Sequence, residues 1–155
     1  ALLELGPRPV TAGRRTLFIV LEGLDGAGKS TLAEGLGQRL AGASLYCTPP
    51  RDALAVRSGI DELPDQRVRR AFYFLCNYLV ASRIQYEAPE IAVCDRYLFS
   101  TVAYAVLQAN GSPRLESWPN DLLRPNLIMY LSVHQQQRQL RLFTREEDTP
   151  LTREE

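Results

Sequence analysis

Residues 16–30 read TLFIVLEGLDGAGKS, and the class of fold can be predicted from this stretch. The nearly continuous apolar run Thr16–Glu22 is typical of a strand that is covered on both faces of a parallel sheet. Gly23–Gly28 predicts a loop, and Ser30–Leu40 carries leucines at helical spacing on one face. A buried strand, a glycine-rich loop and an amphipathic helix in this order predict the first βα unit of an α/β domain.

The loop matches the phosphate-binding pattern G-x-x-x-x-G-K-[ST], or P-loop, from Gly23 to Ser30. Glycines let successive backbone N–H groups turn inward around phosphate oxygens, and the N-terminus of the next helix adds its dipole. Lys29 would lie near the β- and γ-phosphates, and the Ser30 hydroxyl would bind Mg²⁺. A chance match is the alternative, but the flanking strand and helix are the context that the motif requires. The predicted ATP contacts are Gly23, Leu24, Asp25, Gly26, Ala27, Gly28, Lys29, Ser30 and Thr31.

Strand and helix patterns alternate along the rest of the chain. Apolar runs predict strands over Ser44–Cys47, Ile91–Cys94 and Leu127–Val133. Helices are predicted from a cap at Asp65 to about Glu87, over Tyr97–Gln108 and over Gln135–Arg145. The stripe that the long helix is expected to bury consists of Ala71, Phe74, Leu75, Tyr78 and Leu79. This order predicts a P-loop NTPase fold, a three-layer α/β/α sandwich with a parallel sheet.

Composition limits the organisation and the partners of the chain. A length of 155 residues suits one domain, predicted over residues 16–155 after a Pro- and Gly-containing linker over 1–15. The 18 basic residues balance 18 acidic ones, which argues against a nucleic-acid partner, and no apolar run is long enough to span a membrane. Three cysteines without a C-x-x-C pair make a disulfide framework or a zinc site unexpected.

The strand Ile91–Cys94 ends in Asp95, Arg96 and Tyr97. Ligands of open α/β sheets bind beyond the carboxyl ends of the strands, so Asp95 would lie beside the P-loop. There it could hold Mg²⁺ directly or through water, hold Ser30 or act as a base toward the acceptor, while Arg96 would face the transferred phosphate. A salt bridge at a strand end is the alternative. Together with the P-loop, the pattern predicts Lys29, Asp95 and Arg96 as catalytic residues, with Ser30 and Asp95 as metal ligands.

A small-molecule kinase is the expected class of protein. GTPases read guanine with an N-K-x-D motif, which needs a second lysine, and Lys29 is the only lysine of the chain. Arg138, Arg141 and Arg145 recur at helical spacing and share one face. That face is predicted to close over the donor triphosphate, and a solvated face paired with nearby acidic residues is the alternative.

Several stretches resemble the thymidylate kinase family. FIVLEGLDGAGKST (18–31) and CDRYLFSTVAYA (94–105) resemble the family as a whole. RRAFYFLCNYLVAS (69–82), the prolines of CTPPR (47–51) and WPNDLLRPNLIMYL (118–131) are most similar to its mitochondrial UMP–CMP kinase branch. The resemblance implies transfer of the ATP γ-phosphate to a pyrimidine nucleoside monophosphate with Mg²⁺, a mitochondrial location and a homodimer formed through the long helices.

The resemblance also implies residue roles. Asp25 would contact the acceptor sugar, Arg51 and Arg96 would hold the acceptor phosphate, and Tyr97 would pack against the sugar edge. Phe74 would stack on the pyrimidine, with core packing as the alternative for this ring. Arg141 and Arg145 would belong to the donor lid and the adenine side.

Two departures from the family pattern shape the expectation. Tyr78 stands where thymidylate kinases typically have an arginine that reads the thymine carbonyl, which favours uracil or cytosine over thymine. The chain also ends where a further strand and helix are expected, so we expect a C-terminally incomplete domain. Three alternatives stay open: a dTMP kinase, a deoxyribonucleoside kinase with Glu22 as base, and a non-catalytic nucleotide-binding module.

Overall fold

A computed structural model describes residues 15–108 and 117–148, with side chains given up to 104 in the first part and up to 144 in the second. Four strands form one sheet in the order β2-β3-β1-β4, and every neighbouring pair is parallel. The strands are β1 (Leu17–Gly23), β2 (Ala43–Cys47), β3 (Ile91–Asp95) and β4 (Leu127–Leu131). Their carboxyl ends therefore meet at one edge of the sheet, where ligands of such folds bind.

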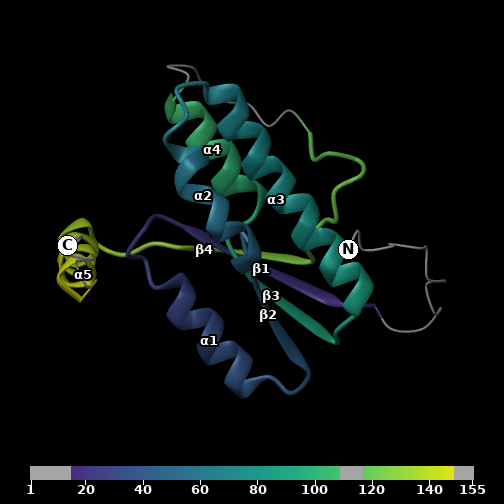
Figure 1. The fold of residues 1–155 in the computed structure, drawn as a ribbon. Helices are drawn as coiled ribbons and strands as arrows, with labels where there is room; N and C mark the ends of the chain where they lie inside the picture. The colour runs from purple at the N-terminus through teal and green to yellow at the C-terminus, as the bar shows by residue number, and fades with distance from the viewer. Residues whose placement is uncertain (1–14, 109–116, 149–155) are drawn as a thin grey trace.

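Helices cover both faces of this sheet, which confirms the predicted α/β sandwich. The helices are α1 (Lys29–Arg39), α2 (Leu54–Asp61), α3 (Gln66–Glu87), α4 (Leu98–Gln108) and α5 (Gln135–Asp148), with a 3₁₀ turn over Arg51–Ala53. Figure 1 shows α1 on one side of the sheet, α3 and α4 on the other, and α5 beyond the strand ends. Among these helices none is long and apolar enough to cross a membrane.

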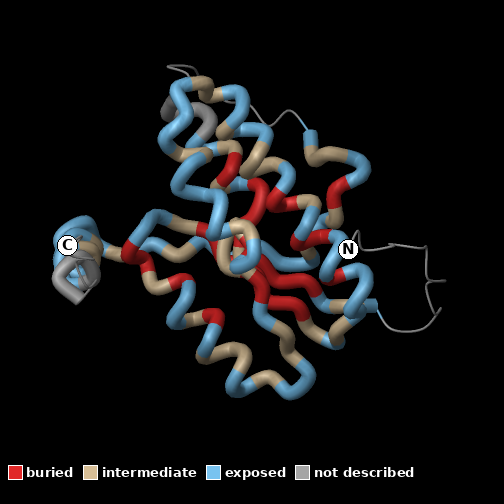
Figure 2. Tube along the Cα trace, viewed as in Figure 1, coloured by how far each residue is buried: buried red, intermediate tan, exposed pale blue. Residues whose placement is uncertain are grey.

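Side chains of β1 alternate between two buried clusters. Phe18 and Val20 pack toward α3 and α4, whereas Ile19 and Leu21 pack toward Ala33 of α1. Figure 2 shows the buried residues concentrated in the central strands and in the helix segments beside them. Because β1 is packed on both faces, the position of its carboxyl end, where the P-loop begins, is held by the core.

The long helix α3 follows its predicted boundaries but buries a different stripe. Its cap is Asp65, whose carboxylate accepts a hydrogen bond of 2.8 Å from the Arg67 amide. Leu75 and Leu79 were expected to be buried but are 54% and 47% exposed. The buried residues are instead Cys76, Asn77, Val80, Ala81 and Ile84. Residues 71–81 are almost all apolar, so helical spacing alone could not select the correct face.

Candidate functional site

Tight backbone turns shape the P-loop between β1 and α1. Gly26 and Gly28 have φ angles of 80° and 95°, which residues other than glycine rarely adopt. A Cβ atom at Gly26 would also lie 2.9 Å from the Arg138 carbonyl oxygen of α5. Gly28 is the N-cap of α1, so the first helical residue is Lys29. The loop therefore presents the helix N-terminus at the strand ends, as an anion site requires.

The Lys29 side chain folds back over this loop. It is 5% exposed, and its Nζ donates a hydrogen bond of 2.9 Å to the Leu24 carbonyl oxygen. Burial, followed by repulsion from Arg96, lowers the pKa of Lys29, while Asp95 and Asp25 oppose that shift. The ammonium group thus lies where charges from the P-loop and from the end of β3 converge.

Ser30 and Asp95, the predicted metal ligands, are in direct contact. The Ser30 hydroxyl donates a hydrogen bond of 2.6 Å to Asp95 Oδ2, and Asp95 Oδ1 is buried without a hydrogen-bond partner among the described residues. A hard divalent cation satisfies such a carboxylate oxygen, so the pair fits Mg²⁺. Within the described ranges no group of three or more His, Cys, Asp or Glu residues could hold a metal. Phosphate oxygens and water would therefore complete the coordination shell.

Arg96 lies between the P-loop and helix α4. Its backbone has a φ angle of 69°, and its Nη2 forms an ion pair with Asp25 Oδ1. Its Nη1 donates to Ser100 Oγ at 3.3 Å, and Tyr104 donates to Asp25 Oδ2 at 2.8 Å. Burial raises the pKa of Asp25, but the Tyr104 hydrogen bond and the charges of Arg96 and Lys29 outweigh it and lower the pKa. Tyr104 was not among the predicted site residues.

A cavity of about 440 Å³ opens beside Arg96, and we call it the inner cavity. Its walls come from the P-loop, the end of β2, helices α2 and α3, and the start of α4. The lining residues are Asp25, Thr48, Pro49, Arg57, Asp61, Arg69, Arg70, Tyr73, Arg96, Tyr97, Ser100, Thr101 and Tyr104. Four of them are arginines and two are carboxylates, so the cavity suits an anion.

A hydrogen-bonded network that the sequence analysis missed forms one wall of the inner cavity. The Asp61 carboxylate accepts from the Tyr73 hydroxyl at 2.7 Å and from Arg57 Nε at 3.2 Å. Arg69 Nη1 donates to the Asp61 carbonyl oxygen at 3.1 Å. Residues 69, 70 and 73 line the cavity because of how α3 is rotated about its axis. The sequence alone did not give that rotation.

Only some of the residues predicted to bind the acceptor line the inner cavity. Arg96 and Tyr97 line the inner cavity, although Tyr97 is only 1% exposed and donates to the Leu123 carbonyl oxygen at 3.1 Å. Phe74 is partly buried against the core beside α4, and neither it nor the exposed Arg51 is among the lining residues. The acceptor roles of Phe74 and Arg51 stay predictions. Tyr78 also faces away from the cavity, since its hydroxyl donates to Asp121 at 2.9 Å.

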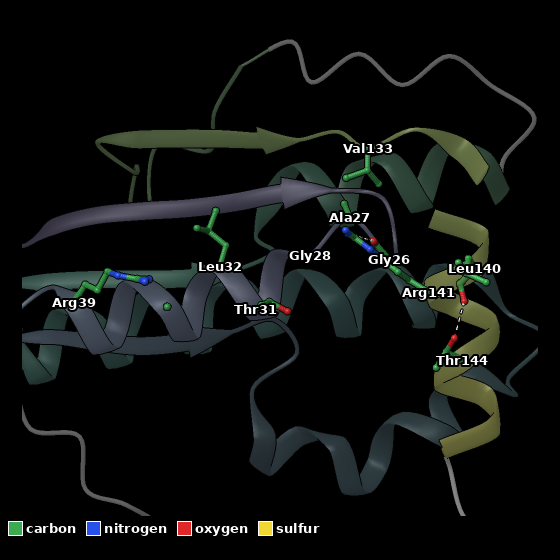
Figure 3. Close-up of a pocket in the computed structure, with 11 residues that line it drawn as sticks. Gly26, Ala27, Gly28, Thr31, Leu32, Arg39, Val133, Leu140, Arg141 and Thr144 are labelled. Atoms are coloured by element: carbon green, nitrogen blue, oxygen red, sulfur yellow. Dashed lines mark hydrogen bonds between the residues drawn. The ribbon is translucent and has the colours of Figure 1, made fainter. Parts of the chain in front are cut away.

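A second cavity, about 850 Å³, lies on the other side of the P-loop, and we call it the outer cavity. Figure 3 shows its lining residues, with Gly26, Ala27 and Gly28 in the P-loop, Thr31, Leu32 and Arg39 on α1, Val133 after β4, and Leu140, Arg141 and Thr144 on α5. Arg141 Nη1 donates to the Gly26 carbonyl oxygen at 3.3 Å, so α5 lies against the P-loop. Arg39 was not predicted, and the side chain of Arg145 lies outside the described residues.

Glu22, the last residue before the P-loop glycines, is 3% exposed. Its Oε1 accepts from the backbone amides of Tyr97 and Ser100 at 3.0 and 3.2 Å, and its Oε2 accepts from the Ser100 hydroxyl. The carboxylate therefore caps helix α4 from within the core. Because its oxygens already accept three hydrogen bonds, the geometry does not favour Glu22 as a base for an incoming hydroxyl.

Comparison with known proteins identifies the family of this chain and agrees with the fold. The family model described as thymidylate kinase matches residues 21–155, and the chain belongs to this family. A human relative, "UMP-CMP kinase 2, mitochondrial", is 36% identical over 151 residues, which cover 91% of this chain and 33% of that protein. A "Probable thymidylate kinase" of Thermoplasma acidophilum is 30% identical over 135 residues, which cover 77% of this chain and 67% of that protein.

A solved structure shows the same fold. Thymidylate kinase from Candida albicans superposes with a TM-score of 0.66 at 19% identity, covering 81% of this chain and 66% of the other. The P-loop NTPase prediction is thereby confirmed for the described part of the chain. The chain spans a third of the length of the human relative and about two thirds of the archaeal one.

Proposed function

We propose that this chain carries the phosphoryl-transfer site of an ATP-dependent kinase for pyrimidine nucleoside monophosphates. The preferred acceptors are dUMP and dCMP, followed by UMP and CMP. The observation that carries the proposal is the position of Arg96, which lines an arginine-rich cavity and lies beside a P-loop with Lys29, Ser30 and Asp95 in place. Membership of the thymidylate kinase family and the name of the human relative support the acceptor class.

The residues of the chain supply position and charge for the transfer. Lys29 exchanges the Leu24 carbonyl for phosphate oxygens of ATP, and the N-terminus of α1 faces the same group. Arg96 stabilises the charge between the acceptor phosphate and the transferred phosphoryl group. Mg²⁺, when bound by Ser30 and Asp95, neutralises charge on the donor phosphates. Catalysis then consists of holding two phosphates in line while their repulsion is offset.

The acceptor is proposed to carry a phosphate rather than a free 5′-hydroxyl. A nucleoside kinase needs a carboxylate base near that hydroxyl, and the Glu22 carboxylate is occupied as the cap of α4. The inner cavity instead offers Arg57, Arg69, Arg70 and Arg96. Paired guanidinium groups bind phosphate through charge-assisted hydrogen bonds, so they favour a monophosphate.

Tyr78 offers the base no charged donor, since its hydroxyl bonds to Asp121 and it does not line the inner cavity. A carbonyl at C4, which thymine and uracil share, therefore gains nothing from this position over the amino group of cytosine. Phosphorylation of dTMP is the second candidate, because the family and most of the similar relatives bear the thymidylate kinase name.

The test is ADP release with Mg-ATP and dCMP, dUMP, CMP, UMP, dTMP or thymidine, measured in parallel on this chain and on a longer chain extended to the length of its thymidylate kinase relatives. Turnover highest with dUMP or dCMP is the expected result. A preference for dTMP would show that the preferred base is thymine and not uracil or cytosine. Turnover with thymidine would show that the acceptor is a nucleoside and not a monophosphate. ATP binding without turnover in both chains would favour a non-catalytic nucleotide-binding module.

We propose two further properties. We infer a homodimer through α3, where Leu75 and Leu79 are exposed, and sedimentation of the wild type against Leu75→Glu tests it. A monomeric wild type would contradict that inference. A mitochondrial location rests on the name of the human relative, and the distribution of a tagged full-length protein in cells tests it.

A further inference from the structure

One hydroxyl connects the buried carboxylate of Glu22 to the guanidinium of Arg96. Ser100 Oγ donates its only hydrogen to Glu22 Oε2 and accepts a hydrogen bond of 3.3 Å from Arg96 Nη1. A serine hydroxyl has one donor and two lone pairs, so the direction of its hydrogen decides what it offers to a neighbour. Because Glu22 takes the hydrogen, a lone pair of Ser100 is left to face the cation.

The backbone of this region is fixed by the same carboxylate. Glu22 caps α4 through the amides of Tyr97 and Ser100, on either side of the helix start at Leu98. Arg96 itself has a left-handed backbone with φ of 69°, and its amide donates to the Leu21 carbonyl oxygen at 2.9 Å. Residues of β1 therefore hold Arg96 both through its backbone and, by way of Ser100, through its side chain.

We propose that Glu22 and Ser100 are positioning residues that aim Arg96 at the acceptor phosphate. Their hydrogen bonds, which we call the relay, link β1, which leads into the P-loop, to the inner cavity. Asp25 of the P-loop holds the other side of the Arg96 guanidinium. The inference rests on the proposed function, since it assigns Arg96 to the acceptor phosphate. Hydrogen bonds that polarise one another in a buried chain favour one orientation over others.

Two variants test the relay in different ways. Ser100→Ala removes the hydroxyl that holds Nη1, and Glu22→Gln keeps the shape but replaces one acceptor with an amide donor. With glutamine, the amide donates to Ser100, whose hydrogen then turns toward the Arg96 cation. We expect Ser100→Ala to raise the Kd and the KM for the monophosphate about tenfold, because a hydrogen bond to a charged group is lost. Glu22→Gln should raise both at least as much, and the KM for ATP should change less than about twofold in either variant.

The matched control is Tyr46→Phe. It also removes one hydroxyl that donates to a glutamate, at 2.6 Å to Glu87, but neither residue lines the inner or the outer cavity. Urea unfolding, calorimetric binding of dCMP and of ATP, and steady-state KM values are measured for all three variants. The control should lose stability without any change in the ratio of the two KM values.

The outcomes separate the relay from the proposed function. Equal loss of ATP and monophosphate binding, or loss of stability alone, would show that Glu22 and Ser100 only support the fold, and would overturn the inference. Absence of monophosphate binding and of phosphoryl transfer in the wild type, including the longer chain, would overturn the proposed function instead. A selective rise in the monophosphate constants supports both.

Discussion

The two cavities beside the P-loop differ in how far their walls are already organised. In the inner cavity, Arg96 is held by Asp25 and Ser100, and Asp61 is held by Tyr73 and Arg57. The outer cavity is lined mainly by glycine, alanine and leucine, and its polar contact to the loop is the hydrogen bond from Arg141 to Gly26. Charges fixed before a ligand arrives cost less to organise on binding. Under the proposed function, we therefore expect the inner cavity to provide specificity and the outer cavity to adapt to its ligand.

The largest effect is expected from a change in the P-loop, which contributes residues to both cavities. Lys29→Ala should lower kcat by at least about a hundredfold, because it removes a preorganised positive charge at the transferred group. The fold should persist, since the Lys29 ammonium makes one hydrogen bond, to Leu24. Turnover and the circular dichroism spectrum measure the two effects. Turnover close to that of the wild type would remove the basis for a kinase.

Arg96→Ala tests the inner side alone. Loss of a charged hydrogen-bonding group from the acceptor phosphate should weaken dCMP binding roughly 10- to 100-fold and leave ATP binding nearly unchanged. Calorimetric titration with each nucleotide measures this. Arg83→Ala is the matched control, because Arg83 forms an exposed ion pair of 2.8 Å with Asp52 and lines neither cavity. If Arg96→Ala and the control bound dCMP equally well, the inner cavity would not be the acceptor site.

Arg141→Ala tests the outer side and should have a smaller effect. Arg141 is exposed and contacts the loop through one long hydrogen bond to a carbonyl group, so ATP affinity should fall only about threefold. The affinity for dCMP should not change. A titration in the same buffer, with Arg83→Ala again as control, measures both. A tenfold loss for dCMP with no loss for ATP would reverse the assignment of the two sides.

The sequence predicted the P-loop and Asp95 but not the wall of the inner cavity that α2 and α3 form. The strand, loop and helix of residues 16–40 were recognised because glycines and a lysine at fixed spacing leave few alternatives, and Asp95 follows from the end of a neighbouring strand. The wall of Arg57, Asp61 and Tyr73 depends on the rotation of α3, and an almost uniformly apolar helix does not encode that rotation. The bonds of Glu22 span 75 residues or more of sequence, so no local pattern indicated them.

The pH dependence of stability at Asp25 should be the smallest of these effects. The pKa of Asp25 is lowered from 3.8, so its ionised form stabilises the fold at pH values above 3.8, and this contribution is lost as pH falls through the lower folded-state pKa. Asp25→Asn removes the ion pair with Arg96, yet the Asp25 side chain is 53% exposed, so the loss at pH 7 should stay below about 1 kcal/mol. Urea unfolding of both proteins at pH 7 and near pH 3 should show a difference that shrinks in acid. A difference that grows in acid would mean that Asp25 is strained by its partners, and the inner cavity would then not be organised before its ligand binds.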